Sequence, residues 1–169
     1  MNYGVFMKRN IRATIEFDGS HYKGFQKQTK WGPTVQGVLE QAIKRTLNEK
    51  IKIYGCSRTD AGVHACNYTI SFKTENPIPV ENLRFVTNNK LPLSIYIKSM
   101  EDAPPEFHAR HLATKKYYIY KVLRGERPEV FQHNYKYYFP ADLDIEKMKL
   151  ALDEFVGEKD FRAFSSKHT

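Results

Sequence analysis

The spacing of apolar residues predicts an alternation of strands and helices along the first part of the chain. Apolar and polar residues alternate from Ile11 to Phe17, which is the period of a half-buried strand. Thr34 is a good helix N-cap, and apolar residues follow it at helical spacing up to Leu47. Further strands are predicted at residues 51–57, 68–72 and 95–99, and a weaker helix at 79–90.

This order, β-α-β-β-α-β, indicates an α+β protein whose first unit is a ferredoxin-like antiparallel sheet. Both helices of such a unit cover one face of the sheet, and the other face is left free to bind a partner. We place this unit at residues 1–103, because Ala103-Pro104-Pro105 reads as a stiff link.

A second α/β unit is predicted at residues 104–169. Lys116 to Leu123 and Tyr135 to Phe139 are expected to be strands, and Gly157 is a plausible end of the helix that follows. Asp144 is expected to cap that helix, whose apolar face is Ile145, Met148, Leu152 and Phe155. We interpret this unit as incomplete, since its remaining strands are missing and the helix face would be poorly covered.

Charge and aromatic content suggest what the protein binds. Lys and Arg number 27 against 19 Asp and Glu, which gives a net charge of +8. An excess of this sign favours a polyanionic partner, although a merely basic protein explains it as well. The aromatic fraction of 14% favours RNA, because aromatic faces stack on unpaired bases.

The cysteines and the hydropathy pattern suggest a cytoplasmic protein. Cys56 and Cys66 match neither a metal-binding pair nor a disulfide framework, and a reduced thiol pair is the expected state. No apolar run approaches the ~20 residues that a membrane-spanning helix needs.

The candidate chemistry lies between the second and third predicted strands, in the segment Gly55 to Ala65. This one loop holds Arg58, Asp60 and His64 at the mouth of the sheet. Asp60-Ala61-Gly62 is also an ordinary turn sequence, so local spacing alone leaves a purely structural role open.

The segment Arg58 to Ala65 resembles the signature loop of the tRNA pseudouridine synthase A family. Four other stretches resemble the family in the same order and extend the likeness over Arg12 to Phe164: Glu16–Ser20 with Gly24–Gln26, Thr34–Glu40, Phe107–Arg110 before Lys116–Tyr120, and Gly157–Phe161 with Phe164. The resemblance implies the pseudouridine synthase fold. It also implies isomerisation of uridine to pseudouridine in the anticodon stem-loop of tRNA, by a homodimer that needs no cofactor.

The resemblance also assigns roles to individual residues. Asp60 matches the catalytic aspartate, and Arg58 matches an arginine that helps to extrude the target uridine and takes its place. Tyr118 matches a tyrosine that packs on the flipped base, with Tyr117 as the rival register. Contacts to the RNA are expected from Lys115, Lys116, Arg110 and His64.

The chain also departs from the family pattern. Phe25 stands where a Trp is usual, and Ser57 replaces a common Gly. The family's C-terminal half supplies an apolar helix and a basic residue that pairs with the catalytic aspartate. This chain ends at Thr169, so it looks truncated relative to the family.

The reaction that the resemblance implies needs neither a metal nor a nucleotide cofactor. It breaks the N1–C1′ glycosidic bond, turns the uracil and joins C5 to C1′, so nothing is oxidised or added. The histidines form no HExxH or comparable set, and we expect no metal site.

Two other functional classes fit parts of the sequence. A non-catalytic RNA-binding module of the RRM kind shares the element order, but Asn67 to Phe72 does not match the RRM octamer. A hydrolase that pairs Asp60 with His64 would need a nucleophile or a metal, and the sequence offers neither.

Overall fold

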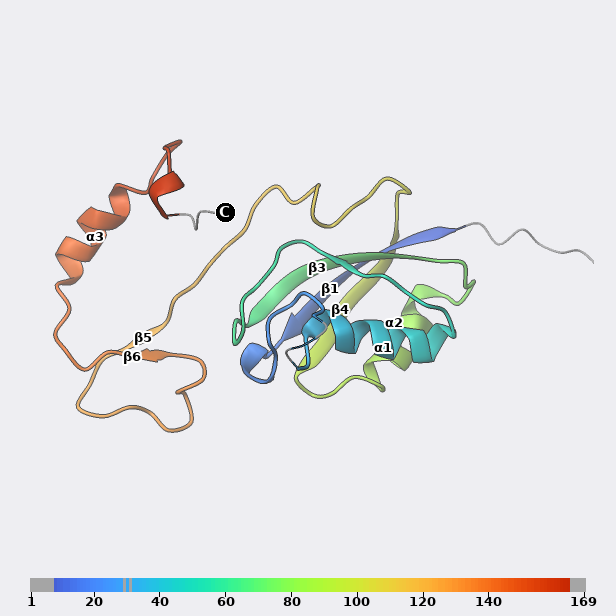
Figure 1. Cartoon of the computed structure of the whole chain (residues 1–169), viewed down its shortest axis with the longest axis horizontal. Helices are drawn as coiled ribbons and strands as arrows, with labels where there is room; N and C mark the ends of the chain where they lie inside the picture. The colour runs from blue at the N-terminus through green and yellow to red at the C-terminus, as the bar shows by residue number, and fades with distance from the viewer. Residues whose placement is uncertain (1–7, 29, 31, 165–169) are drawn as a thin grey trace, which may run out of the picture. The chain divides into compact units, whose positions relative to one another are not determined.

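Strand β1 (Arg9–Phe17) lies inside a four-stranded antiparallel sheet in the computed structural model, which describes residues 8–28, 30 and 32–164. The strand order is β2-β3-β1-β4, where β2 is Tyr54–Gly55, β3 is Ala65–Thr74 and β4 is Ile95–Ala103. Helix α1 (Val35–Leu47) and helix α2 (Val80–Asn88) cover one face of the sheet (Figure 1). The predicted order β-α-β-β-α-β is therefore confirmed.

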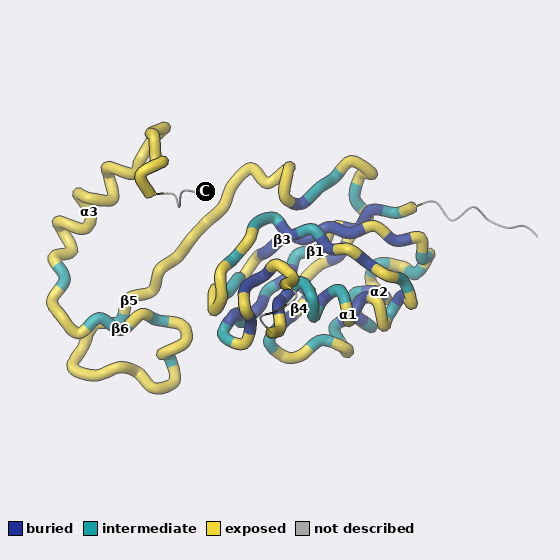
Figure 2. The backbone as a smooth tube through the Cα atoms, viewed as in Figure 1, coloured by how far each residue is buried: buried dark blue, intermediate teal, exposed yellow. Residues whose placement is uncertain are grey.

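The core lies between this sheet and the two helices (Figure 2). The alternating residues of β1 that face the helices, from Ile11 to Phe17, are at most 4% exposed. Leu39 and Ile43 of α1 and Leu83 of α2 are fully buried against them. Burial of side chains of this size stabilises the fold by about 1.5–3 kcal/mol each.

Helix α1 has a defined start and a defined end. The Thr34 side chain accepts a hydrogen bond from the Gly37 backbone N–H at 3.3 Å, which satisfies one of the free donors at the helix N-terminus. Asn48 ends the helix in the left-handed conformation, with φ 56°, and its N–H donates to the Lys44 carbonyl. The predicted N-cap is confirmed.

The second face of the sheet is partly covered, which corrects the expectation that it is free. The chain crosses this face after β4: the Asn10 side-chain amide donates to the carbonyls of Pro104 and Phe107, at 2.8 Å each. Nearby, the Ala109 N–H donates to the Ser71 hydroxyl at 3.1 Å. Asn10 and Ser71 are consequently only 5% and 2% exposed.

Strand β2 is much shorter than the predicted strand at 51–57. The Ile53 N–H donates to the Glu40 carboxylate at 3.1 Å, and the Ile53 carbonyl accepts from the Gln36 side chain at 3.0 Å. These backbone groups are therefore satisfied by side chains of α1 and do not form a ladder with β3.

The chain forms two compact units, Met1–Tyr118 and Ile119–Thr169. In the second unit, β5 (Val122–Leu123) pairs in parallel with β6 (Tyr137–Tyr138), and helix α3 (Ile145–Asp153) follows. The Asp144 side chain accepts from the Lys147 N–H at 3.0 Å, so the predicted cap of this helix is confirmed.

Two details of the second unit differ from the prediction. Residues 116–121 form no strand, because none of their N–H groups donates to a backbone carbonyl among the described residues. Helix α3 ends at Asp153 and its C-cap is Glu154, so Phe155 and Gly157 lie beyond it. None of the nine residues of α3 is buried, in line with the expectation of a poorly covered helix.

Across the described ranges, no helix is both long enough and apolar enough to cross a membrane. Cys56 is partly buried and Cys66 is exposed, and neither forms a disulfide among the described residues.

Candidate catalytic site

The loop between β2 and β3 is held at its start by a buried tyrosine. The Tyr68 hydroxyl accepts from the Ser57 N–H at 3.2 Å and donates to the Ser57 carbonyl. The ring of Tyr68 stacks on Phe25, with 4.5 Å between the centroids. Burial raises the pKa of Tyr68 above its ordinary value, so the hydroxyl keeps the proton that it donates.

The middle of the loop packs against the chain that follows β1. The Phe25 N–H donates to the Thr59 carbonyl at 3.1 Å, and the Gly62 N–H donates to the Tyr22 carbonyl at 3.3 Å. Gly24 allows this approach: its φ is +90°, and a Cβ there would lie 2.5 Å from the Thr59 carbonyl oxygen. The two loops therefore fix the backbone on both sides of Asp60.

The end of the loop is held at His64. Its Nδ1 atom lies 3.0 Å from Asp18 Oδ1 and 3.2 Å from the Gly19 backbone nitrogen. One tautomer of the neutral ring donates to Asp18 and the other accepts from Gly19, so either tautomer holds the loop in place. The structure thus directs His64 Nδ1 toward Asp18, whereas the hydrolase hypothesis pairs His64 with Asp60.

Asp60 opens onto a surface depression of about 330 Å³, which is lined by Lys23, Gln28, Thr59, Asp60 and Ala61. Asp60 itself is exposed, and its carboxylate forms no hydrogen bond or ion pair with another described residue. The adjacent Thr59 hydroxyl is buried and has no hydrogen-bond partner in the described part of the chain. A carboxylate in this position is available to a ligand that enters the depression.

Lys23 and Gln28 are residues that the sequence reasoning missed. Both are exposed, and the Gln28 side-chain amide donates to the Lys23 carbonyl at 3.4 Å. They flank the stretch Gly24-Phe25-Gln26, which the sequence already singled out, and that adjacency is the signal that would have found them.

Arg58 lies two residues before Asp60 on the same loop, and its side chain is exposed. It does not line the depression, and it forms no ion pair with Asp60 or with any other residue that the structure describes. Arg58 and Asp60 therefore lie on one loop, but their side chains form no ion pair with each other.

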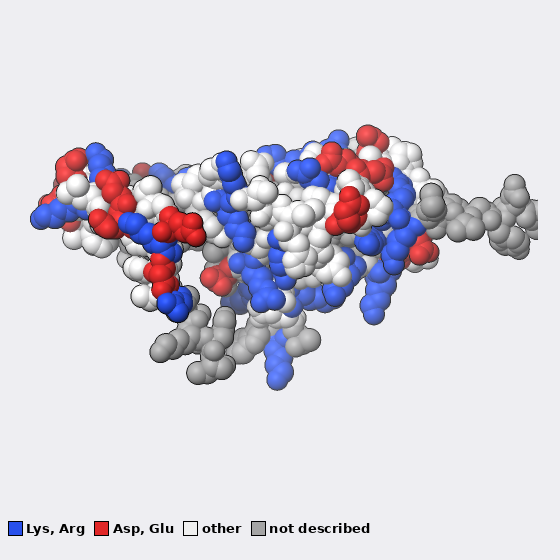
Figure 3. Space-filling view, turned by 90° about the horizontal axis from the view of Figure 1, so that it is seen from above, with Lys and Arg blue, Asp and Glu red and all other residues white. Residues whose placement is uncertain are grey.

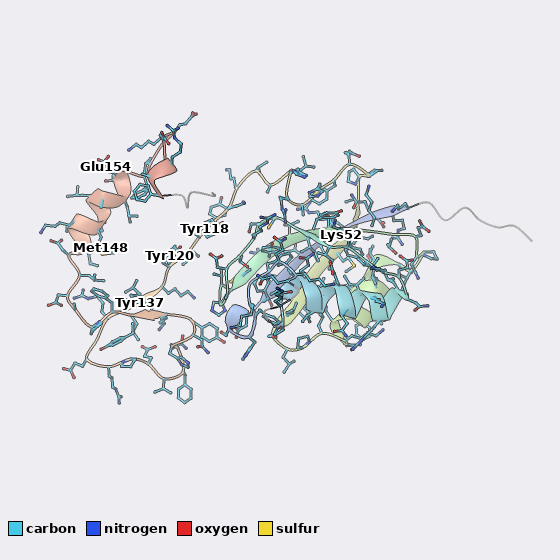
Figure 4. The ribbon with its side chains drawn as sticks, in the orientation of Figure 1. Lys52, Tyr118, Tyr120, Tyr137, Met148 and Glu154 are labelled. Atoms are coloured by element: carbon cyan, nitrogen blue, oxygen red, sulfur yellow. The ribbon has the colours of Figure 1, made fainter. Side chains whose placement is uncertain are left out.

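Tyr118 lies in the irregular segment at the end of the first unit (Figure 4). Its side chain is 66% exposed, and that of the rival Tyr117 is 85% exposed. No contact between Tyr118 and Asp60 is present among the described residues. Lys115 and Lys116 are exposed in the same segment, and Arg110 is exposed in the turn that follows β4.

The described residues contain no group of three or more His, Cys, Asp or Glu side chains that could hold a metal ion. The rings of His108 and His111 do lie together, with 4.2 Å between their centroids.

A family model described as tRNA pseudouridine synthase matches residues 13–111, which is more than half of the chain and includes the Asp60 loop. Over 156 residues the chain is 46% identical to "tRNA pseudouridine synthase A 2" of Clostridium perfringens, an alignment that covers 92% of this chain and 64% of that protein. It is 42% identical over 158 residues to "tRNA pseudouridine synthase A" of Caldicellulosiruptor bescii, an alignment that covers 94% of this chain and 64% of that protein. It is 41% identical over 163 residues to "tRNA pseudouridine synthase A" of Brevibacillus brevis, an alignment that covers 96% of this chain and 66% of that protein.

The chain therefore spans less than two thirds of the length of these relatives. Within that span the likeness includes the loop that carries Asp60 and Arg58, together with the strands and helices that position it. The chain belongs to the tRNA pseudouridine synthase family.

Proposed function

We propose that the whole protein isomerises uridine to pseudouridine in the anticodon stem-loop of tRNA, with Asp60 as the catalytic carboxylate. The observation that carries the proposal is the position of Asp60: it lies in the region matched by the family model and opens onto the 330 Å³ depression. A carboxylate held by a fixed backbone is suited to attack a reacting centre or to move a proton there.

The reaction is balanced without a cofactor. The N1–C1′ bond breaks, the uracil turns, and C5 forms a new bond to C1′. The hydrogen at C5 leaves as a proton, and N1 gains a proton. The bond that breaks supplies the electrons for the bond that forms, so no oxidant or reductant takes part.

The target nucleotide must leave its stack, which costs a few kcal/mol. Arg58 and Tyr118 are proposed to offset this cost, because a guanidinium plane and an aromatic ring replace stacking contacts of the base. The exposure of both side chains supports this proposal, since each is accessible to an RNA.

Basic side chains are proposed to hold the tRNA backbone. Lys and Arg side chains are visible on the surface in Figure 3, with Asp and Glu side chains among them. Lys115, Lys116 and Arg110 are exposed and are proposed to contact phosphates, and His64 is proposed to lie close to the RNA beside the catalytic loop. A homodimer in the cytoplasm is the proposed state of the full-length protein.

We further infer that the first unit is of the ferredoxin-like kind and that its functional boundary lies near residue 103, with 104–169 opening a second α/β unit. The order β2-β3-β1-β4 with α1 and α2 on one face supports this fold. The completed fold is then that of a pseudouridine synthase.

The proposal is tested by mapping the product on the RNA. A tRNA transcript is incubated with the full-length protein or with its Asp60→Ala variant, treated with a carbodiimide that marks pseudouridine, and read by primer extension. A stop in the anticodon stem-loop only with the unchanged protein is expected. A stop with both proteins, or stops confined to other parts of the tRNA, would refute the proposal.

A further inference from the structure

A row of rings lies at the β2 edge of the sheet, outside the Asp60 depression. The Lys52 ammonium sits 5.1 Å from the centroid of the Tyr54 ring. The Tyr54 ring lies 4.6 Å from that of His108, and the His108 ring lies 4.2 Å from that of His111. Tyr54 is in β2 and Lys52 lies two residues before it, whereas the two histidines lie in the turn after β4.

The row is held in place by hydrogen bonds beneath it. Tyr54 pairs with Ser71 across β2 and β3, so both side chains point to the sheet face opposite the helices. The Ser71 hydroxyl accepts from the Ala109 N–H, which fixes the turn that carries the histidines. The rings are therefore arranged before any partner arrives.

The His108 ring is the fixed centre of the row. Its Nδ1 accepts from the backbone N–H groups of Arg110 and His111, at 3.2 Å and 3.4 Å. Burial, followed by the charges of His111 and Arg110, lowers the pKa of His108. A neutral ring suits its position between two other rings.

The outer end of the row is open and its surroundings are cationic. His111 is exposed, and His108 is the one ring that lies beside it among the described residues, so its ring is accessible to a partner. Lys52, Lys73 and Arg110 are exposed, and none is ion-paired with a residue in the described ranges. Lys73 follows Ser71 by two positions on β3 and so faces the same side of the sheet. Figure 4 labels Lys52 on the first unit.

We propose that this row is a second RNA-contact surface, on which an unpaired base of the tRNA stacks against His111 while Lys52, Lys73 and Arg110 contact the neighbouring phosphates. Stacking rings beside free cations are the combination that binds single-stranded RNA. An acidic peptide would use the cations but would leave the ring row without a partner. The inference rests on the proposed function in one respect: that function identifies the RNA as a tRNA.

The test compares the affinity of the 169-residue chain and its variants for a fluorescently labelled tRNA, by anisotropy. His111→Ala is expected to weaken binding about fivefold, which is the lower end of the range for losing one stacked base. His111→Phe keeps a ring and should bind within about twofold of the unchanged chain. Phe85→Ala is the matched control, because Phe85 is 66% exposed on α2, against the opposite face of the sheet, and its loss should not change binding.

Each of the following results would refute the proposed RNA-contact surface. If His111→Ala binds the tRNA as tightly as the unchanged chain, no base stacks on His111. If Phe85→Ala loses as much affinity as His111→Ala, the loss is a general effect of truncating an exposed ring. A loss in His111→Phe as large as that in His111→Ala shows that the ring does not act by stacking. Asp60→Ala separates the two proposals, because it should abolish pseudouridine formation and leave tRNA binding, including its dependence on His111, unchanged.

Discussion

Gly24 is a residue at which the chain after β1 packs closely on the backbone of the Asp60 loop. Gly24→Ala would combine a strained φ of +90° with a Cβ 2.5 Å from the Thr59 carbonyl oxygen. We expect a loss of about 2–4 kcal/mol in the free energy of unfolding, because strain and collision add. Urea denaturation measures this loss.

The control is Gly62→Ala in the same loop. Gly62 also has a positive φ, +79°, but a Cβ there would meet nothing within 4 Å. Its substitution therefore carries strain alone, expected at about 1 kcal/mol. Equal losses in the two variants would show that the close packing on Thr59 does not matter.

Tyr68 ties the buried core to Ser57, near the start of the Asp60 loop. Tyr68→Phe removes both hydrogen bonds to Ser57 and is expected to cost about 1–2 kcal/mol at neutral pH. Burial raises the pKa of Tyr68 above its ordinary value of 10.0, so its contribution is complete below pH 10.0. That contribution is lost as the pH rises from there toward the folded-state pKa, since the unfolded chain ionises first.

The measurement is urea denaturation of both proteins at a series of pH values on either side of 10.0. The stability of the unchanged chain should fall more steeply above this pH than that of Tyr68→Phe. Parallel curves would mean that the Tyr68 hydroxyl ionises as it does in the unfolded chain.

Sequence reasoning reached only some residues of the candidate site. Asp60 and Arg58 stand in a loop that resembles the signature loop of the family, and that resemblance singles them out where local spacing alone does not. Lys23 and Gln28 join the depression because Gly24 and Phe25 pack on the Thr59 backbone. Such packing between distant segments leaves no periodic trace in the sequence, and these two residues were missed for that reason.

At the scale of elements, helix α1 positions both sides of the site through Glu40. The Glu40 carboxylate accepts from the Ile53 N–H at 3.1 Å and from the Lys27 ammonium at 3.1 Å, and its side chain is 12% exposed. Glu40→Ala leaves the Ile53 N–H without its acceptor, and we expect a loss of about 2–3 kcal/mol. Urea denaturation gives the value.

The matched control is Glu81→Ala, which removes an exposed carboxylate from the first turn of α2. Its favourable interaction with the helix dipole is worth less than about 1 kcal/mol. If the two substitutions cost the same, the contacts of Glu40 with the two loops contribute nothing beyond those of a surface charge.

Helices and strands were predictable where the spacing of apolar residues coincides with partners for the backbone hydrogen bonds. Helix α1 follows from its N-cap and its apolar spacing, and β1 has neighbouring strands that satisfy its backbone. The segment 116–121 has the composition of a strand, but among the described residues only the Lys121 carbonyl accepts a backbone hydrogen bond from a strand, from the Tyr137 N–H of β6 at 2.8 Å. Residue preference alone does not make a strand, because its N–H and C=O groups need partners.

In the whole molecule, a strong positive charge accompanies the loop that carries Asp60. The net charge of +8 suits a polyanion, and the family match covers the sheet and the Asp60 loop together. The order of elements was predictable because it depends on local periodicity. The crossing of the sheet by residues 104–109 was not, because it depends on single contacts made by Asn10 and Ser71.

The most direct measurement of the central claim is tritium release from a tRNA transcript that carries 5-³H-uridine. The full-length protein and its Asp60→Asn variant are compared, with tRNA binding measured in parallel. Asn keeps the size and polarity of the side chain and removes only the carboxylate. We predict release by the unchanged protein, no release by Asp60→Asn, and equal binding by both. Release by both proteins would contradict the assignment of Asp60 as the catalytic residue, and release by neither while the tRNA stays bound would contradict the isomerase itself.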